Sequence, residues 1–356
     1  MKKTIIFAVL GLFIILISLS YGEEPTVHQA VYYDNKEGIN HYQDIVEALT
    51  HVEENGTLYV DKPITISTLG VKTLNIRKSM TIRGLNNQEN KIIIKNRGIG
   101  PVFNLGNITS FKLENMNISG NDVVVVKGAA DYITIKDCKF LDCIPIYTTA
   151  SRLKEVLFES NEVIGGSVYI QPSIYGAEVE VRNNTFDVSD TAVYGFNLEN
   201  SKVLIENNHF NGVSFNIHDG EAAAGLIQYN TFERDGRKIL VKEDNQNLQF
   251  KNNWIYKNTG EVYYRGNGAL SFTRNWWGDK AGPEEDIFDG NIDYGDWSLF
   301  EDFRRYAEDP YTMADLQDAY DYLELAVDKD NWIYDMDKDQ YIRFLDLIAI
   351  SRRIIE

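Results

Sequence analysis

One pattern of residues recurs every 22 to 24 positions through most of the chain. Eight copies, aligned on the Asn of "NNTF", place one column at Met116, Cys138, Asn161, Asn184, Asn208, Asn230, Asn253 and Asn275. The columns five and three positions before it, and two positions after it, are apolar in nearly every copy. Such a period indicates stacked identical units, because a unit that cannot bury its own apolar face is buried by its neighbours.

Within each copy, apolar and polar residues alternate, which is the period of a β-strand with one buried face. Stacking these strands predicts an all-β solenoid, a right-handed parallel β-helix of about nine rungs over residues 25–300. Equivalent residues then lie above one another. We expect the Asn column to form a hydrogen-bonded ladder at a turn, where Asn also tolerates the left-handed conformation.

The two ends of the repeat carry more specific motifs. The stretch "RNWWGDKAGP…GNIDYGDW", from Arg274 to Trp297, closes the repeat, and "INHYQDIVEAL…GTLYV" opens it. We expect a short amphipathic helix from Tyr42 to Leu49 to cap the open end, because a solenoid end otherwise exposes apolar surface and strand edges. These motifs resemble the right-handed β-helix repeat family, which includes pectate lyases, other carbohydrate-active enzymes and adhesin-like surface proteins.

The N-terminus predicts export. Lys2 and Lys3 precede an apolar run over residues 5–17, and "SYG" ends at Gly22. This is the pattern of a secretory signal peptide over residues 1–22, with the mature protein secreted or on the cell surface. An uncleaved N-terminal anchor is the alternative, and only that alternative brings the chain into contact with a membrane.

Charge narrows the choice of partners. The net charge is -18, and residues 279–346 hold 21 acidic against 6 basic residues. Nucleic acid requires a basic face, so it is excluded as a partner. The acidic stretch fits a solvated surface or cation binding. The chain's two cysteines, Cys138 and Cys143, are too few for a disulfide scaffold, and they either pair or pack as free thiols.

A 12-residue stretch near the C-terminus, "DMDKDQYIRFLD", has the spacing of a calcium loop. Positions 1, 3, 5 and 12 are carboxylates and position 7 supplies a backbone carbonyl, which is how a loop binds a hard cation. The predicted ligands are Asp335, Asp337, Asp339, Tyr341 and Asp346.

With the amphipathic "LIAISRRII" that follows it, this loop resembles one calcium-binding half of a dockerin module. Gln340 stands where Gly usually makes the turn, and the helical stretch 312–326 lacks a loop of its own, so the module is incomplete. The resemblance implies a structural calcium ion and a cohesin-like protein partner. We expect this module over residues 311–356, after a charged linker at 301–310; a solvated acidic linker with one helix is the alternative.

Two sets of residues are candidates for function on the outer face. Carboxylates, a His and bases on three neighbouring rungs could serve a glycoside hydrolase or a polysaccharide lyase; these residues are Asp187, Asp190, His218, Asp219, Glu233, Arg237 and Lys238. Tyrosine faces stack on sugars, and the candidates for binding carbohydrate are Tyr169, Tyr175, Tyr194, Tyr263 and Tyr264. Ordinary turn residues and inward-packed aromatics are the competing interpretations. The sequence therefore favours an exported protein that binds carbohydrate or a protein partner, with an enzyme as the alternative.

Overall fold

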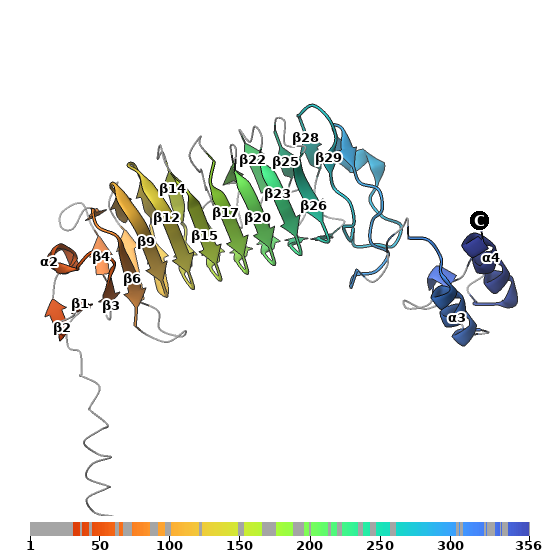
Figure 1. Ribbon diagram of the computed structural model, residues 1–356, viewed down its shortest axis with the longest axis horizontal. Helices are drawn as coiled ribbons and strands as arrows, with labels where there is room; N and C mark the ends of the chain where they lie inside the picture. Colours follow the sequence, from red (N-terminus) through yellow and green to blue (C-terminus); the bar gives the residue numbers. More distant parts are fainter. Residues whose placement is uncertain are drawn as a thin grey trace, which may run out of the picture.

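The structure is a computed structural model of the chain. It describes residues 31–35, 38–42, 45–60, 64–66, 73–85, 92–96, 101–120, 123–148, 153–165, 176–187, 196–198, 201–212, 215–218, 223–233, 238–242, 247–256, 261–303, 306, 309–323, 325, 332–334, 336 and 341–355. The predicted signal peptide at 1–22 lies outside these residues. Strands stack side by side along one long axis, and two helices lie beyond the last rungs (Figure 1).

Four sheets make up the described solenoid. Sheet A has 13 strands in the order β2 (Gly38–Tyr42), β1 (Val31–Asn35), β3 (Gly56–Val60), β6 (Met80–Gly84), β9 (Ile108–Glu114), β12 (Ala130–Lys136), β15 (Glu155–Glu159), β17 (Glu178–Arg182), β20 (Lys202–Glu206), β23 (Ala224–Gln228), β26 (Asn247–Lys251), β29 (Leu270–Ser271) and β31 (Ile292–Asp293). Sheet B has nine, β27 (Trp254–Ile255), β24 (Thr231–Glu233), β21 (His209–Asn211), β18 (Thr185–Asp187), β16 (Glu162–Ile164), β13 (Lys139–Leu141), β10 (Met116–Ser119), β7 (Ile92–Asn96) and β4 (Ile64–Ile66).

The third side of the coil is split in two. Sheet C contains β14 (Ile146–Thr148), β11 (Val124–Val126), β8 (Phe103–Leu105) and β5 (Leu74–Ile76), whereas sheet D contains β19 (Phe196–Asn197), β22 (Phe215–His218), β25 (Ile239–Val241), β28 (Val262–Tyr264) and β30 (Phe288–Asp289). The chain passes from sheet A to sheet B, then to C or D, and back to A. From β3 onward the pairings are parallel, and the predicted number of about nine rungs is close to the strand number of sheet B.

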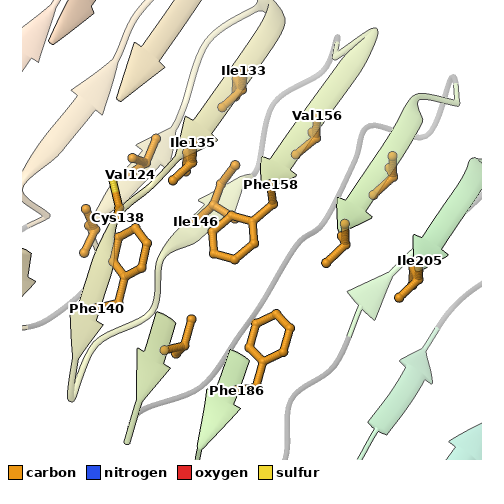
Figure 2. Packing of buried hydrophobic residues seen from close by; sticks show 14 of the residues in the cluster. Val124, Ile133, Ile135, Cys138, Phe140, Ile146, Val156, Phe158, Phe186 and Ile205 are labelled. Atoms are coloured by element: carbon orange, nitrogen blue, oxygen red, sulfur yellow. The ribbon is translucent and has the colours of Figure 1, made fainter. Parts of the chain in front are cut away.

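The register of the strands confirms the apolar columns. On sheet A, Ile135 pairs with Phe158 and Phe158 with Val181, and on sheet B Phe186 pairs with Phe210. All five side chains are buried, and Figure 2 shows Ile135, Phe158 and Phe186 in the interior of the coil. Phenylalanine rings also stack from rung to rung, with centroids 4.9 Å apart for the Phe186–Phe210 pair. Burying one such side chain contributes about 1.5–3 kcal/mol, so the columns supply the core.

The Asn column forms the expected ladder at the turn from sheet A to sheet B. The Nδ2 of Asn184 donates to Oδ1 of Asn208 at 2.9 Å, and the Nδ2 of Asn208 donates to Oδ1 of Asn230 at 2.9 Å. The same contact continues through Asn253 to Asn275. Each of these amides also serves backbone groups, so the buried polar atoms are satisfied.

The left-handed conformation belongs to the residue before the ladder, and our assignment of it to the Asn column is wrong. The corner residues have φ between 54° and 59°, and they are Asn115, Asp137, Ser160, Asn183, Asn207, Tyr229, Asn252 and Arg274. The ladder residue that follows can then turn its amide inward. Because this corner accepts Ser, Tyr and Arg as well as Asn, the turn geometry is imposed by the ladder and the strands rather than by the corner residue's own preference.

The closing motif has a packing explanation. Trp277 is buried against Phe272 and Phe288. Gly282, at φ +78°, lies against the ring of Trp297, where an added Cβ would approach within 2.6 Å of Cε2. Gly282 and Trp297 of this motif therefore depend on each other, because only Gly allows the ring to approach the backbone so closely.

The expected cap and C-terminal helices are present with shifted bounds. The capping helix α2 (Ile45–His51) buries Ile45 and Ala48 in the main core. The C-terminal helices are α3 (Met313–Asp321) and α4 (Phe344–Ile355), and the structure also has the short 3-10 helices η1 (Glu285–Ile287) and η2 (Trp332–Tyr334). Helices α3 and α4 share a second hydrophobic core with Phe300, separate from that of the solenoid.

Candidate functional site

The outer face of sheet B carries two columns of polar side chains in register. Thr185 pairs with His209 and His209 with Thr231, which makes the first outer column. Asp187 pairs with Asn211 and Asn211 with Glu233, which makes the second. Side chains two residues apart on a strand share a face, so both columns point away from the core.

Hydrogen bonds join neighbouring rungs within and between these columns. The Nδ2 of Asn211 donates to Oδ1 of Asp187 at 3.2 Å, and Nε2 of His209 lies 3.0 Å from Oε2 of Glu233. The His209 and Glu233 side chains are 44% and 39% exposed. These groups are therefore ordered by their neighbours and still accessible to a ligand.

An open groove of about 450 Å³ follows the first outer column and reaches the second at Glu233 and Tyr256, a volume in the range of small-ligand sites. Its lining consists of Asn183, Asn184, Thr185, Asn207, Asn208, His209, Tyr229, Thr231, Glu233 and Tyr256. The floor at Asn184 and Asn208 belongs to the buried ladder. The rim at Asn183, Asn207 and Tyr229 is formed by the left-handed corner residues, which are exposed.

The described residues 301–303 and 306 lie beside the groove's C-terminal end. We call these residues the strap. Trp254 donates from Nε1 to the carbonyl oxygen of Glu301 at 2.9 Å, and the ring of Phe303 lies 4.7 Å from that of Trp254. Tyr306 donates its hydroxyl to Oδ1 of Asn252 at 2.9 Å. The predicted linker at 301–310 therefore begins as a segment packed on the solenoid.

Tyr256 connects the second outer column to the strap. Its hydroxyl donates to Oε1 of Glu301 at 3.4 Å. Partial burial, reinforced by the negative charges of Glu301 and Glu233, raises the pKa of the Tyr256 hydroxyl. The hydroxyl thus stays protonated at neutral pH and remains a donor.

The predicted catalytic residues are divided between two faces. Asp187 and Glu233 lie in the second outer column. Lys238 precedes β25 in sheet D, where its Nζ is 2.6 Å from Oε2 of Glu261. His218 ends β22, also in sheet D. Glu233 on sheet B and Lys238 beside sheet D therefore do not share a face, while Asp190, Asp219 and Arg237 lie outside the described residues.

The two described tyrosine candidates for binding carbohydrate, Tyr263 and Tyr264, do not present free ring faces. Tyr264 is 1% exposed, with its hydroxyl donating to the Asn267 carbonyl oxygen at 3.1 Å, so its prediction as a sugar-stacking residue is wrong. The alternating pattern of the strand turns it inward. The ring of Tyr263 is occupied by Lys238 Nζ at 4.6 Å and by the Arg265 guanidinium at 5.1 Å. Tyr169, Tyr175 and Tyr194 lie outside the described residues.

The calcium prediction rests on a loop that is partly described. Asp346 is fully buried and accepts hydrogen bonds from the backbone amides of Met336 at 2.6 Å and Arg343 at 2.7 Å. Its carboxylate thus closes the loop at the position of the last predicted ligand. Tyr341 is described, whereas Asp335, Asp337 and Asp339 are outside the described residues. Where side chains are described, His, Cys, Asp and Glu do not gather into a metal-binding group of three or more.

Sequence reasoning missed most of the groove. The proximity of His209 to Glu233 was not inferred, and Asn211, Tyr229 and Tyr256 were not singled out. The available signal was the pair of outer columns at the positions one and three after the ladder Asn. The cysteines are free and buried, with the thiol of Cys138 donating to the Lys136 carbonyl oxygen at 3.2 Å.

Comparison with protein families agrees with this architecture. Residues 124–297 match the family model described as the right handed beta helix region. The chain is a right-handed parallel β-helix. The match supports the predicted β-helix repeat family, and this family is compatible with carbohydrate binding and with lyase or hydrolase activity. Neither the curated proteins nor the solved structures give a match. Within the described part of the chain, no helix is long and apolar enough to span a membrane.

Proposed function

We propose that this β-helix protein binds carbohydrate through the groove on sheet B and is exported to the cell exterior. The observation that carries this proposal is the groove itself. It combines amide, hydroxyl, imidazole and carboxylate groups in two ordered columns with the exposed ring of Tyr229 at the rim. A sugar presents both hydroxyl groups, which such polar atoms bind, and an apolar ring face, which an aromatic side chain covers.

The C-terminal module supports a second role, attachment to a larger extracellular assembly. Helices α3 and α4 have a core of their own, and Asp346 closes the loop before α4. We propose that calcium bound at Asp335, Asp337, Asp339, Tyr341 and Asp346 stabilises this module, which then docks a cohesin-like protein. Calcium is expected to raise the module's melting temperature, and Asp337→Ala to abolish the rise while leaving the solenoid's own transition unchanged.

The groove is tested by two matched tyrosine variants of the full chain. Tyr229 is 40% exposed at the groove, and Tyr132 is 41% exposed on sheet A. Affinity electrophoresis through gels containing neutral or acidic polysaccharides measures retention. Tyr229→Ala should lose at least about tenfold in affinity, whereas Tyr132→Ala should bind like the native protein. Equal loss in both variants, or no retention of the native protein, contradicts binding at the groove.

One geometric observation favours an enzyme as the second candidate. Asp187 and Glu233 lie on the same outer column, two strands apart, which separates their backbones by about 10 Å at ordinary strand spacing. This is close to the separation of about 6.5–9.5 Å between the carboxyl groups of an inverting glycoside hydrolase. If the groove hydrolyses glycosides, new reducing ends appear with the native protein, and Asp187→Asn and Glu233→Gln each abolish them. Retention without cleavage leaves binding as the function.

A further inference from the structure

Strap residues contact Trp254, Tyr256 and Tyr229 at the C-terminal end of the groove. We infer that the site binds the terminal units of a neutral glycan chain rather than its interior. This inference rests on the carbohydrate-binding function proposed above. It adds which part of the polymer is bound and which class of polymer is preferred.

The first outer column ends at an aromatic wall. Moving toward the C-terminus, Thr231 is followed in register by Trp254. The Trp254 ring is fixed by its hydrogen bond to the Glu301 carbonyl oxygen, and the Phe303 ring packs on its face edge-on at 62°. Phe303 also approaches the Tyr229 ring at the rim, with centroids 6.5 Å apart. A chain lying over Thr185 and His209 would meet these rings at its end.

The second outer column ends at the same wall. Glu233 is followed on the next rung by Tyr256, whose hydroxyl is bound to the Glu301 carboxylate. The far end of the strap is anchored by Tyr306, which hydrogen-bonds Asn252 and lies under the guanidinium of Arg274 at 4.7 Å. Two independent anchors therefore hold the strap across both columns.

The opposite end of the groove lacks such a wall in the described part of the chain. Here the columns continue from Thr185 and Asp187 to Glu162 and Ile164 of the preceding rung. No strap residue reaches this rung among the contacts of the described residues. Thr185 lies three strand spacings from Trp254 at the wall, a length of about 14 Å, which holds about three pyranose units.

The charges in the groove select against acidic polymers. Glu233 lines the groove, and the carboxylates of Asp187 and Glu301 lie beside it on the second outer column and the strap. The one described histidine of the lining, His209, already faces Glu233. A polyuronate would place a carboxylate on every unit beside these groups, and like charges at this distance repel. A neutral chain meets no such repulsion and can donate its hydroxyl groups to the same carboxylates.

The length of the polysaccharide distinguishes binding to chain ends from binding to internal segments. Linear neutral glucan, mannan and xylan, each as a long and a short preparation of equal mass, are titrated against the full chain by isothermal calorimetry; polygalacturonate is the acidic probe. Binding to chain ends predicts that the number of sites per gram rises in proportion to the number of ends. Among oligosaccharides, affinity should stop increasing at about three units. Polygalacturonate should bind at least about tenfold more weakly, and added salt should narrow that difference.

Removing the wall provides the matched variant. The double variant Trp254→Ala, Tyr306→Ala removes the Trp254 ring and one hydrogen bond from each anchor of the strap. It should bind long and short preparations in proportion to mass, because internal segments can then pass the end of the groove; an unchanged solenoid melting temperature verifies folding. If the native protein already binds in proportion to mass, the inference about chain ends is wrong while carbohydrate binding stands. If polygalacturonate binds best, the charge argument is wrong. If no polysaccharide binds, the proposed function fails together with this inference.

Discussion

Replacing Asn208 with alanine removes the central member of the ladder. Its Oδ1 accepts hydrogen bonds from the backbone amide of Asn184 at 3.0 Å and from the Asn184 side chain at 2.9 Å. Its Nδ2 donates to Asn230 at 2.9 Å and to the carbonyl oxygen of Val181 at 2.8 Å. Asn208 itself is 2% exposed, so water cannot replace these partners freely.

The expected loss of stability follows from these four contacts. A protein hydrogen bond contributes a net of about 0.5–1.5 kcal/mol, so four of them contribute about 2–6 kcal/mol, and a buried group left without a partner costs about 1–3 kcal/mol. We expect Asn208→Ala to lower the free energy of unfolding by about 4 kcal/mol, which is near the upper end for single substitutions.

Asn207 provides the control, because it is the adjacent residue of the same type and is exposed. Its contribution is the left-handed corner at φ 55°, and Asn207→Ala should cost only about 1 kcal/mol. Urea unfolding monitored by tryptophan fluorescence measures both variants. Hydrogen exchange of the Asn184 amide, which loses its acceptor only in Asn208→Ala, gives a local readout that does not require a two-state transition. Equal losses in the two variants, with unchanged exchange at Asn184, would refute the ladder's contribution.

Three further substitutions test separate parts of the molecule. Gly225→Ala should destabilise the solenoid by at least about 3 kcal/mol, because the new Cβ would lie 1.9 Å from the Val203 carbonyl oxygen. Gly106→Ala, whose new Cβ would lie 3.4 Å from its nearest atom, should be tolerated, and thermal melts compare the two variants. The folded pKa of Glu159 is lowered by hydrogen bonds and charges from neighbouring rungs. Glu159 should therefore contribute up to about 1 kcal/mol to the free energy of unfolding above the ordinary carboxyl pKa of 4.5, and this contribution should be lost as pH falls through the lowered folded value. Urea unfolding of the native protein and of Glu159→Gln from pH 7 to pH 3 measures it. Asp346→Ala should unfold the C-terminal module by removing the buried carboxylate that accepts from two backbone amides, about 3 kcal/mol. The measurement is loss of helical circular dichroism with the solenoid transition retained.

The repeat made the fold predictable. Because equivalent side chains are stacked in register, aligning the sequence on Asn184 and its counterparts already assigned the inward columns, including Phe186 and Val181, to their places in the core. The error in the left-handed corner was a shift of one residue. An alternating strand and a turn Asn are compatible with either placement, and only the ladder's hydrogen bonds decide which amide turns inward.

The site was less predictable because outward positions carry no repeat. The charged candidates were assigned to three neighbouring rungs, but each rung was represented by residues that follow one another along the chain. This grouped Glu233 with Lys238. In a solenoid, neighbours on one face are a full rung apart in the sequence, as His209 and Glu233 are, while residues five apart have already turned to another sheet. The strap was hidden for the same reason, since Phe303 meets Tyr229 across more than three rungs of sequence.

At each corner, adjacent residues serve the core and the site separately. The ladder residue turns inward, the left-handed residue before it forms the rim, and the residue after it starts an outer column. The Asn184–Asn208–Asn230 ladder fixes the spacing of the groove, whereas Thr185, His209 and Thr231 are free to differ, since their side chains lie outside the core. Substitutions along the outer columns should therefore change which sugars bind while leaving stability within about 0.5 kcal/mol of the native value. A loss at the ladder should weaken both, because the rungs that carry the binding groups would no longer be held in register.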